Sequence, residues 1–84
     1  MQTQVLEQLL AKLDSDSYSI GQYKEHAYCM QKKGANWEVF YGKNSLHLGS
    51  RTFVSQEEAN KYFYRMLMEK LNQQIINHVD SAQK

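Results

Sequence analysis

The chain has 84 residues, of which 42% are hydrophobic, 23% charged and 12% aromatic. This composition is that of a soluble globular protein, and the length suits one small domain spanning residues 1–84. Ten basic and nine acidic side chains give a net charge of +1, so long-range attraction for nucleic acid or for an anionic membrane is weak.

The lone cysteine, Cys29, excludes an internal disulfide and fits a reducing compartment. The N-terminal sequence MQTQVLEQLLAKLD has neither the basic start nor the continuous apolar run of a signal peptide. No stretch approaches the roughly 20 apolar residues that a membrane-spanning helix needs. We therefore expect a cytoplasmic protein with no membrane partner.

The N-terminal segment has the pattern of an amphipathic helix over about residues 3–13. Its apolar residues are spaced by one, three and four positions: Val5, Leu6, Leu9, Leu10 and Leu13. The helix is expected to end at the sequence DSDS (14–17), because Asp and Ser favour caps and turns over helix interiors. In the following YSIGQYKE stretch, a glycine interrupts a short extended piece, and no element is assigned there.

Three strands are predicted at about residues 26–32, 37–42 and 46–53. The sequences KKGAN and GKNS between them contain Gly and Asn, which tolerate positive φ and suit hairpin turns. Gly49 marks a possible bulge in the third strand. Tight turns between consecutive strands predict a three-stranded antiparallel meander.

A long C-terminal helix is predicted over about residues 56–76. Ser55 and Glu58 form a capping-box sequence, and Val54 and Ala59 occupy the hydrophobic-staple positions. The apolar residues that follow have helical spacing: Ala59, Tyr62, Phe63, Met66, Leu67, Leu71 and Ile75. The element order is therefore α-β-β-β-α, an α+β fold in which helices pack on a sheet.

No sequence motif names a reaction. Cys29 could act as a nucleophile with His26 or His47 as its base, but a mid-strand cysteine without a neighbouring cation is more simply a buried thiol. The histidines, which include His78, lack the spacing of a metal site, and there is no glycine-rich phosphate loop. We therefore expect no enzyme activity, no cofactor and no bound metal.

The strands carry large side chains on both faces. If Trp37, Val39 and Tyr41 pack under the helices, Phe40 points the other way, and similar splits occur in the other two strands. One outcome is a helix on each face, with nothing exposed. The other is an exposed patch with the residue types of protein interfaces, for a partner or for self-association. The candidate partner-binding residues are Tyr28, Met30, Phe40, His47 and Arg51.

The order α-β-β-β-α is also that of the double-stranded RNA-binding domain, whose second helix opens with a Ser and a lysine-rich run. Ser55 and Ala59 match that pattern, but the three lysine positions hold Gln56, Glu57 and Asn60. The chain has no proline, so the Gly-Pro-x-His loop of that family is missing as well. An acidic helix start opposes a phosphate backbone, so nucleic-acid binding is kept only as an alternative.

The pattern W-x-V-F-Y-G followed by F-x-S-x-E-x-A-x-x-Y-F resembles the small immunity proteins encoded beside toxins in bacterial polymorphic toxin systems. The YSIG stretch (18–21) also fits these sequences. The matching positions of the pattern are Trp37, Val39, Phe40, Tyr41, Gly42, Phe53, Ser55, Glu57 or Glu58, Ala59, Tyr62 and Phe63.

This resemblance implies a cytosolic, non-catalytic inhibitor that occludes a cognate toxin. The strand pattern adds the expectation that the inhibitor acts through the sheet surface. The near-zero net charge departs from the acidic face that would suit an inhibitor of a nuclease, which puts a nuclease target in doubt. The alternatives are a nucleic-acid-binding domain of double-stranded RNA-binding topology and a structural homodimer.

Overall fold

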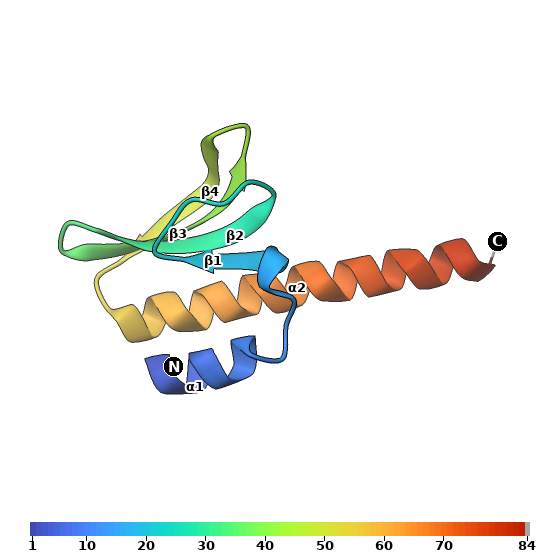
Figure 1. The fold of residues 1–84 in the computed structure, drawn as a ribbon, viewed down its shortest axis with the longest axis horizontal. Helices are drawn as coiled ribbons and strands as arrows, with labels where there is room; N and C mark the ends of the chain where they lie inside the picture. Colours follow the sequence, from blue (N-terminus) through green and yellow to red (C-terminus); the bar gives the residue numbers. More distant parts are fainter. Residues whose placement is uncertain (84) are drawn as a thin grey trace.

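A computed structural model describes the backbone of residues 1–83 and the side chains of residues 1–72, and it confirms the α+β class (Figure 1). Its elements, in chain order, are helix α1 (Thr3–Leu10), a 3₁₀ turn (Ser15–Ser17), strands β1 (Tyr18–Ile20), β2 (Ala27–Lys33), β3 (Asn36–Lys43) and β4 (Leu46–Phe53), and helix α2 (Gln56–Gln83). Helix α2 continues past the edge of the sheet (Figure 1). The side chains of Ile75 and His78 lie outside the described residues.

The sheet has four strands in the order β1-β2-β3-β4. The prediction of a three-stranded, wholly antiparallel sheet is therefore wrong, because β1 pairs with β2 in parallel while the other pairs are antiparallel. The missed strand has three residues, too few for an alternating pattern. Because β1 is so short, the chain has only about 10 Å to return before β2 begins, and residues 21–26, the crossover loop, are enough to do this.

Helix α1 is shorter than the predicted 3–13 and ends at Leu10. The N–H groups of Lys12 and Leu13 bond to the carbonyls of Leu9 and Leu10, so the chain tightens into i to i−3 turns. Leu13 still packs against the core. The apolar spacing therefore predicts the buried residues correctly but extends the helix too far.

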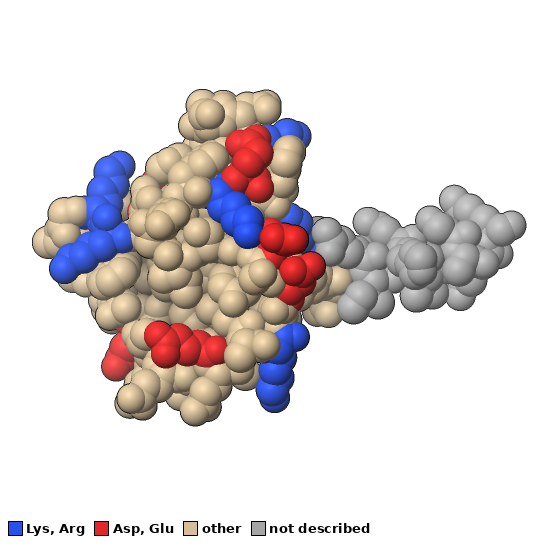
Figure 2. Space-filling view, in the orientation of Figure 1, with Lys and Arg blue, Asp and Glu red and all other residues tan. Residues whose placement is uncertain are grey.

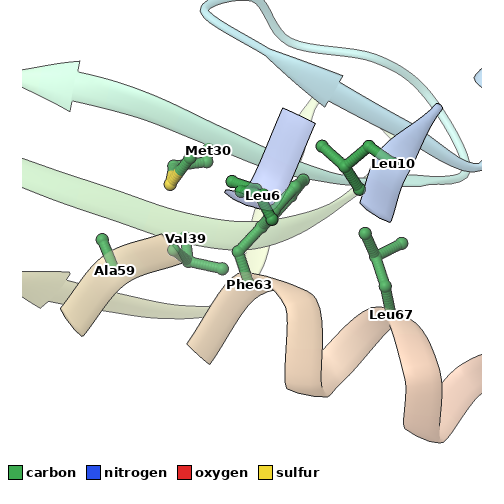
Figure 3. Packing of buried hydrophobic residues seen from close by; sticks show 7 residues of the cluster. All are labelled: Leu6, Leu10, Met30, Val39, Ala59, Phe63 and Leu67. Carbon is green, nitrogen blue, oxygen red and sulfur yellow. The ribbon is translucent and has the colours of Figure 1, made fainter. Parts of the chain in front are cut away.

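Both helices lie on the same side of the sheet, which we call the helix side (Figure 1). The apolar stripes of α1 and α2 meet the side chains of β2 and β3 in one buried cluster (Figure 3). Its members are Leu6, Leu10, Met30, Val39, Ala59, Phe63 and Leu67. Trp37 and Tyr28 pack against the margin of this cluster.

The opposite face, the loop side, is covered by the crossover loop. Tyr23 stacks on Phe40 with the ring centroids 6.1 Å apart, and the N–H of Lys24 donates a hydrogen bond to the Cys29 sulfur at 3.3 Å. The loop passes so close to Gly42 that a Cβ there would overlap the Lys24 carbonyl oxygen. The second face is therefore neither left exposed nor covered by a helix, the two outcomes expected from the sequence.

The crossover loop is fastened to the β3–β4 turn by a carboxylate. Glu25 accepts a hydrogen bond from the N–H of Asn44 at 2.6 Å and another from the hydroxyl of Tyr23. The Tyr23 oxygen in turn accepts the N–H of Ser45 at 2.9 Å. Asn44 and Ser45 both have positive φ, as in a type I′ hairpin turn, so the turn presents adjacent N–H groups to the loop.

Candidate functional site: an exposed edge strand beside a tyrosine groove

The five predicted partner-binding residues do not share one surface. Residues that pair across an antiparallel ladder lie on the same face, and Met30 pairs with Val39, which pairs with Arg51. Tyr28, Met30 and Arg51 are therefore on the helix side. Phe40 pairs with Cys29 on the loop side, where its ring stacks on His47 with centroids 3.7 Å apart.

Burial divides the five further. Met30 and Phe40 are each 1% exposed, so neither presents an exposed side chain to a partner. Tyr28 is half-buried, and Arg51 is exposed. An open patch that includes Tyr28, Met30 and Phe40 together does not form, because the helices cover one face of the meander and the crossover loop covers the other.

A β-bulge separates His47 from Arg51. Four residues apart, they would share a face in a regular strand. The β3–β4 register shifts opposite Phe40, so Gly49 and Ser50 together face a single residue of β3. The extra residue turns Arg51 to the helix side, and Gly49 has the positive φ of 60° that such a bulge accommodates.

On the loop side, Glu38 is the centre of a buried polar cluster. Its carboxylate is 3% exposed and accepts hydrogen bonds from the Ser50 hydroxyl and from the Gln31 amide at 3.3 Å. The Nδ1 of His47 lies 3.1 Å from the oxygen that Ser50 also contacts. Ser50 donates to the carboxylate and not to the imidazole, so the arrangement stabilises a buried charge and does not activate the serine as a nucleophile.

The pKa of Glu38 reflects two opposing causes. Burial raises it, but the hydrogen bonds from Ser50, His47 and Gln31 lower it more, so the pKa lies below its ordinary value of 4.5. The pKa of Glu25 is also lowered, mainly by its hydrogen bonds from Tyr23 and Asn44. Both carboxylates therefore stabilise the folded chain in their charged form.

We expect the free energy of unfolding to fall on acidification. On acidification, the unfolded chain takes up protons near the ordinary pKa of 4.5, before the folded chain does. The stabilisation from the charged Glu25 and Glu38 carboxylates is therefore complete above that pH, and it is lost as the pH falls through their lower pKa values in the folded chain. Urea denaturation from pH 7 to pH 3 measures the effect. The Glu38→Gln variant should show a shallower decline, whereas Glu7→Gln, at an exposed position of α1, should follow the parent. An unchanged decline in Glu38→Gln would contradict this assignment.

Cys29 is buried between the sheet and the crossover loop. Its pKa is raised mainly by burial, which disfavours the thiolate needed for nucleophilic chemistry. Its hydrogen-bonding partners are backbone groups of Lys24 and Ala27. The thiol thus has the surroundings of a structural residue.

Between β4 and α2 lies an open groove of about 250 Å³ on the helix side, which we call the tyrosine groove. It is lined by Tyr28, Val39, Phe40, Tyr41, Leu48, Gly49, Tyr62 and Met66. The rings of Tyr28 and Tyr41 meet edge to face with centroids 5.1 Å apart. Aromatic rings provide a large contact area at a low cost in side-chain entropy, which favours binding of a partner side chain.

Two cations flank the tyrosine groove. The Nζ of Lys70 donates a hydrogen bond to the Tyr41 hydroxyl at 3.2 Å and lies 4.3 Å from the centre of that ring. The guanidinium of Arg51 lies 5.5 Å from the ring centre of Tyr62. Tyr62, whose ring Arg51 contacts, and Lys70 are eight residues apart on α2, so their backbone positions are about 12 Å apart along the helix.

Strand β4 forms the outer edge of the sheet beside this groove. Seven of its eight residues, from Leu46 to Thr52, are exposed, and among the described residues no strand pairs with its outer edge. Leu46 and Leu48 are 58% and 41% exposed. Alternate backbone N–H and C=O groups of an edge strand point outward, free to pair with another chain.

The candidate residues chosen from the sequence do not include the groove residues Tyr41, Leu48, Tyr62 and Met66 or the flanking Lys70. The helical spacing of Tyr62 and Met66 indicates inward-facing residues, and both are half-buried. A usable signal was present in the spacing of Tyr62, Met66 and Lys70, which defines a second stripe on α2 beside the buried one.

Where side chains are described, no group of three or more His, Cys, Asp or Glu residues is arranged to hold a metal ion. In the same part of the chain, no helix combines the length and apolar character required to cross a membrane. The chain matches no protein-family model, no curated protein and no solved structure.

Proposed function

We propose that this protein is a non-catalytic protein-binding module that binds its partner through strand β4 and the tyrosine groove. The observation that carries the proposal is an eight-residue edge strand, exposed almost throughout and lying next to an aromatic groove. Folded proteins usually cover, shorten or charge such an edge, because it can pair with other chains. An edge that is left open beside a groove favours recognition of another polypeptide.

The immunity-type inhibitor is the specific form that we propose, with a cognate toxin as the partner in the bacterial cytoplasm. Several residues that carry this resemblance are buried, among them Val39, Phe40, Ala59 and Phe63. They therefore act in folding, and the exposed residues of β4 are the ones available for contact with a toxin.

A rescue experiment tests this function. The C-terminal domain of the protein encoded beside this gene is expressed in a bacterial host with and without the chain. We expect growth to be restored only when both are present and a stoichiometric complex to form by titration calorimetry. A toxic neighbouring domain that neither binds the chain nor is neutralised by it would contradict the inhibitor proposal.

For nucleic acid, we expect no measurable affinity of the chain for duplex RNA. Asn60, one of the three positions where the RNA-binding family has lysines, is fully buried and donates to the Met1 carbonyl and the Thr3 hydroxyl. On the face shown in Figure 2, charges of both signs are interspersed, and the blue side chains are spread over several places besides the tip of the β2–β3 hairpin. Fluorescence anisotropy over a salt series is the measurement, and binding that weakens steeply with salt would favour the alternative.

A further inference from the structure

We infer that the segment recognised by this protein is an extended acidic strand with the pattern acidic-x-apolar-x-acidic, which pairs with β4 and places its apolar side chain in the tyrosine groove. This inference rests on the proposed function and adds the chemistry of the partner. It is carried by the free edge of β4, the aromatic lining of the groove and the two cations that flank it.

The spacing of the cations fits an extended strand. Every second side chain of a strand points to the same face, and four residues span about 13 Å. This length is close to the rise of about 12 Å along α2 between Tyr62, whose ring Arg51 contacts, and Lys70. A strand on β4 that points an apolar residue into the groove therefore brings the residues two before and two after it toward the two cations.

The charges favour an acidic partner over a second copy of this chain. Strand β4 contains Arg51 and His47 but no acidic residue. Two copies paired through β4 would bring the same cations together, and like charges on neighbouring strands destabilise the pairing. An acidic strand instead meets Arg51 and Lys70 with opposite charge, and the bulge at Gly49 restricts pairing to strands that fit its shape.

The probe is a ten-residue threonine peptide with a central Glu-Thr-Phe-Thr-Glu sequence, titrated into the full chain and followed by amide chemical shifts. The matched peptide carries Lys in place of both Glu residues. We expect the acidic peptide to bind about tenfold more tightly, because two ion pairs replace two repulsions. Shift changes and slowed amide exchange should concentrate in β4 and around the groove.

Variants of the chain complete the test. The double variant Arg51→Glu, Lys70→Glu should reverse the preference between the two peptides. The control Lys12→Glu, Lys33→Glu makes the same charge change at exposed positions outside the groove and β4, and should keep the preference of the parent. Circular dichroism and thermal unfolding establish that each variant is folded.

The inference is overturned if neither peptide binds, if both bind equally, or if the charge-reversed variant keeps the parent's preference. A dimer in sedimentation that protects β4 without peptide also overturns it. The toxin experiment is independent of these outcomes. If a toxin binds the charge-reversed variant as tightly as the parent, the acidic-strand inference is contradicted but the inhibitor function is not. If acidic peptides bind as expected but the chain rescues no host from a toxin, the inhibitor function is contradicted but the peptide-binding surface is not.

Discussion

Replacing Phe63 with alanine is expected to lower the free energy of unfolding by about 3–5 kcal/mol. The ring is fully buried in the cluster that joins α1, α2 and the sheet, near Leu6 and Val39 (Figure 3). Its removal leaves a cavity that neighbouring side chains on three elements fill only in part. A domain of this kind has a total stability of about 5–15 kcal/mol, so the variant loses a large share of it.

Urea denaturation followed by far-ultraviolet circular dichroism measures this loss. The matched control is Lys61→Ala, two residues earlier in α2 at an exposed position, which should change the stability by less than about 0.5 kcal/mol. If Phe63→Ala were no more destabilised than this control, Phe63 would not be the centre of the core.

Replacing Gly42 with alanine is expected to displace the crossover loop and expose Cys29. A Cβ on Gly42 would overlap the carbonyl oxygen of Lys24 and lie 3.0 Å from the Tyr23 ring. Overpacking of this kind destabilises a protein by about 1–3 kcal/mol. Because Cys29 is the only cysteine and is fully buried under this loop, its rate of reaction with a thiol reagent reports directly on loop displacement.

The control for this variant is Gly34→Ala. Gly34 has a φ of +63° and open space around it, so alanine there strains the backbone by about 1–2 kcal/mol without touching the crossover loop. At the same loss of stability, Gly42→Ala should therefore label much faster than Gly34→Ala under native conditions. Equal labelling of the two variants would show that Cys29 becomes accessible only by global unfolding.

The register of the strands divides the five predicted partner-binding residues between the two faces of the sheet. The sequence shows that large side chains lie on both faces of the meander, but not which sets of each strand face the same way. The observed pairing puts Met30 with Val39 and Phe40 with Cys29, and each set is buried on a different face. Because neighbouring residues of a strand point to opposite faces, an uncertainty of one position in register is enough to misplace every side chain.

Local chemistry determined much of this fold. The N–H of Glu58 donates a hydrogen bond to the Ser55 hydroxyl at 3.5 Å. Helix α2 begins at Gln56, directly after Ser55, as the capping sequence predicts. The third predicted strand, 46–53, coincides with β4. Caps, hairpin turns and apolar periodicity involve residues within one or two turns of each other, so these features can be read directly from the chain.

Only the tertiary structure decided what covers the second face of the sheet and which surface stays open. Four features depend on contacts between residues distant in sequence. They are the pairing of β1 with β2, the stacking of Tyr23 on Phe40, the orientation of Arg51 after the bulge, and the groove between β4 and α2. Such contacts depend on strand register and on the direction of the connecting loop. Sequence periodicity reports whether a residue faces inward, but it carries no information about which distant element meets it there.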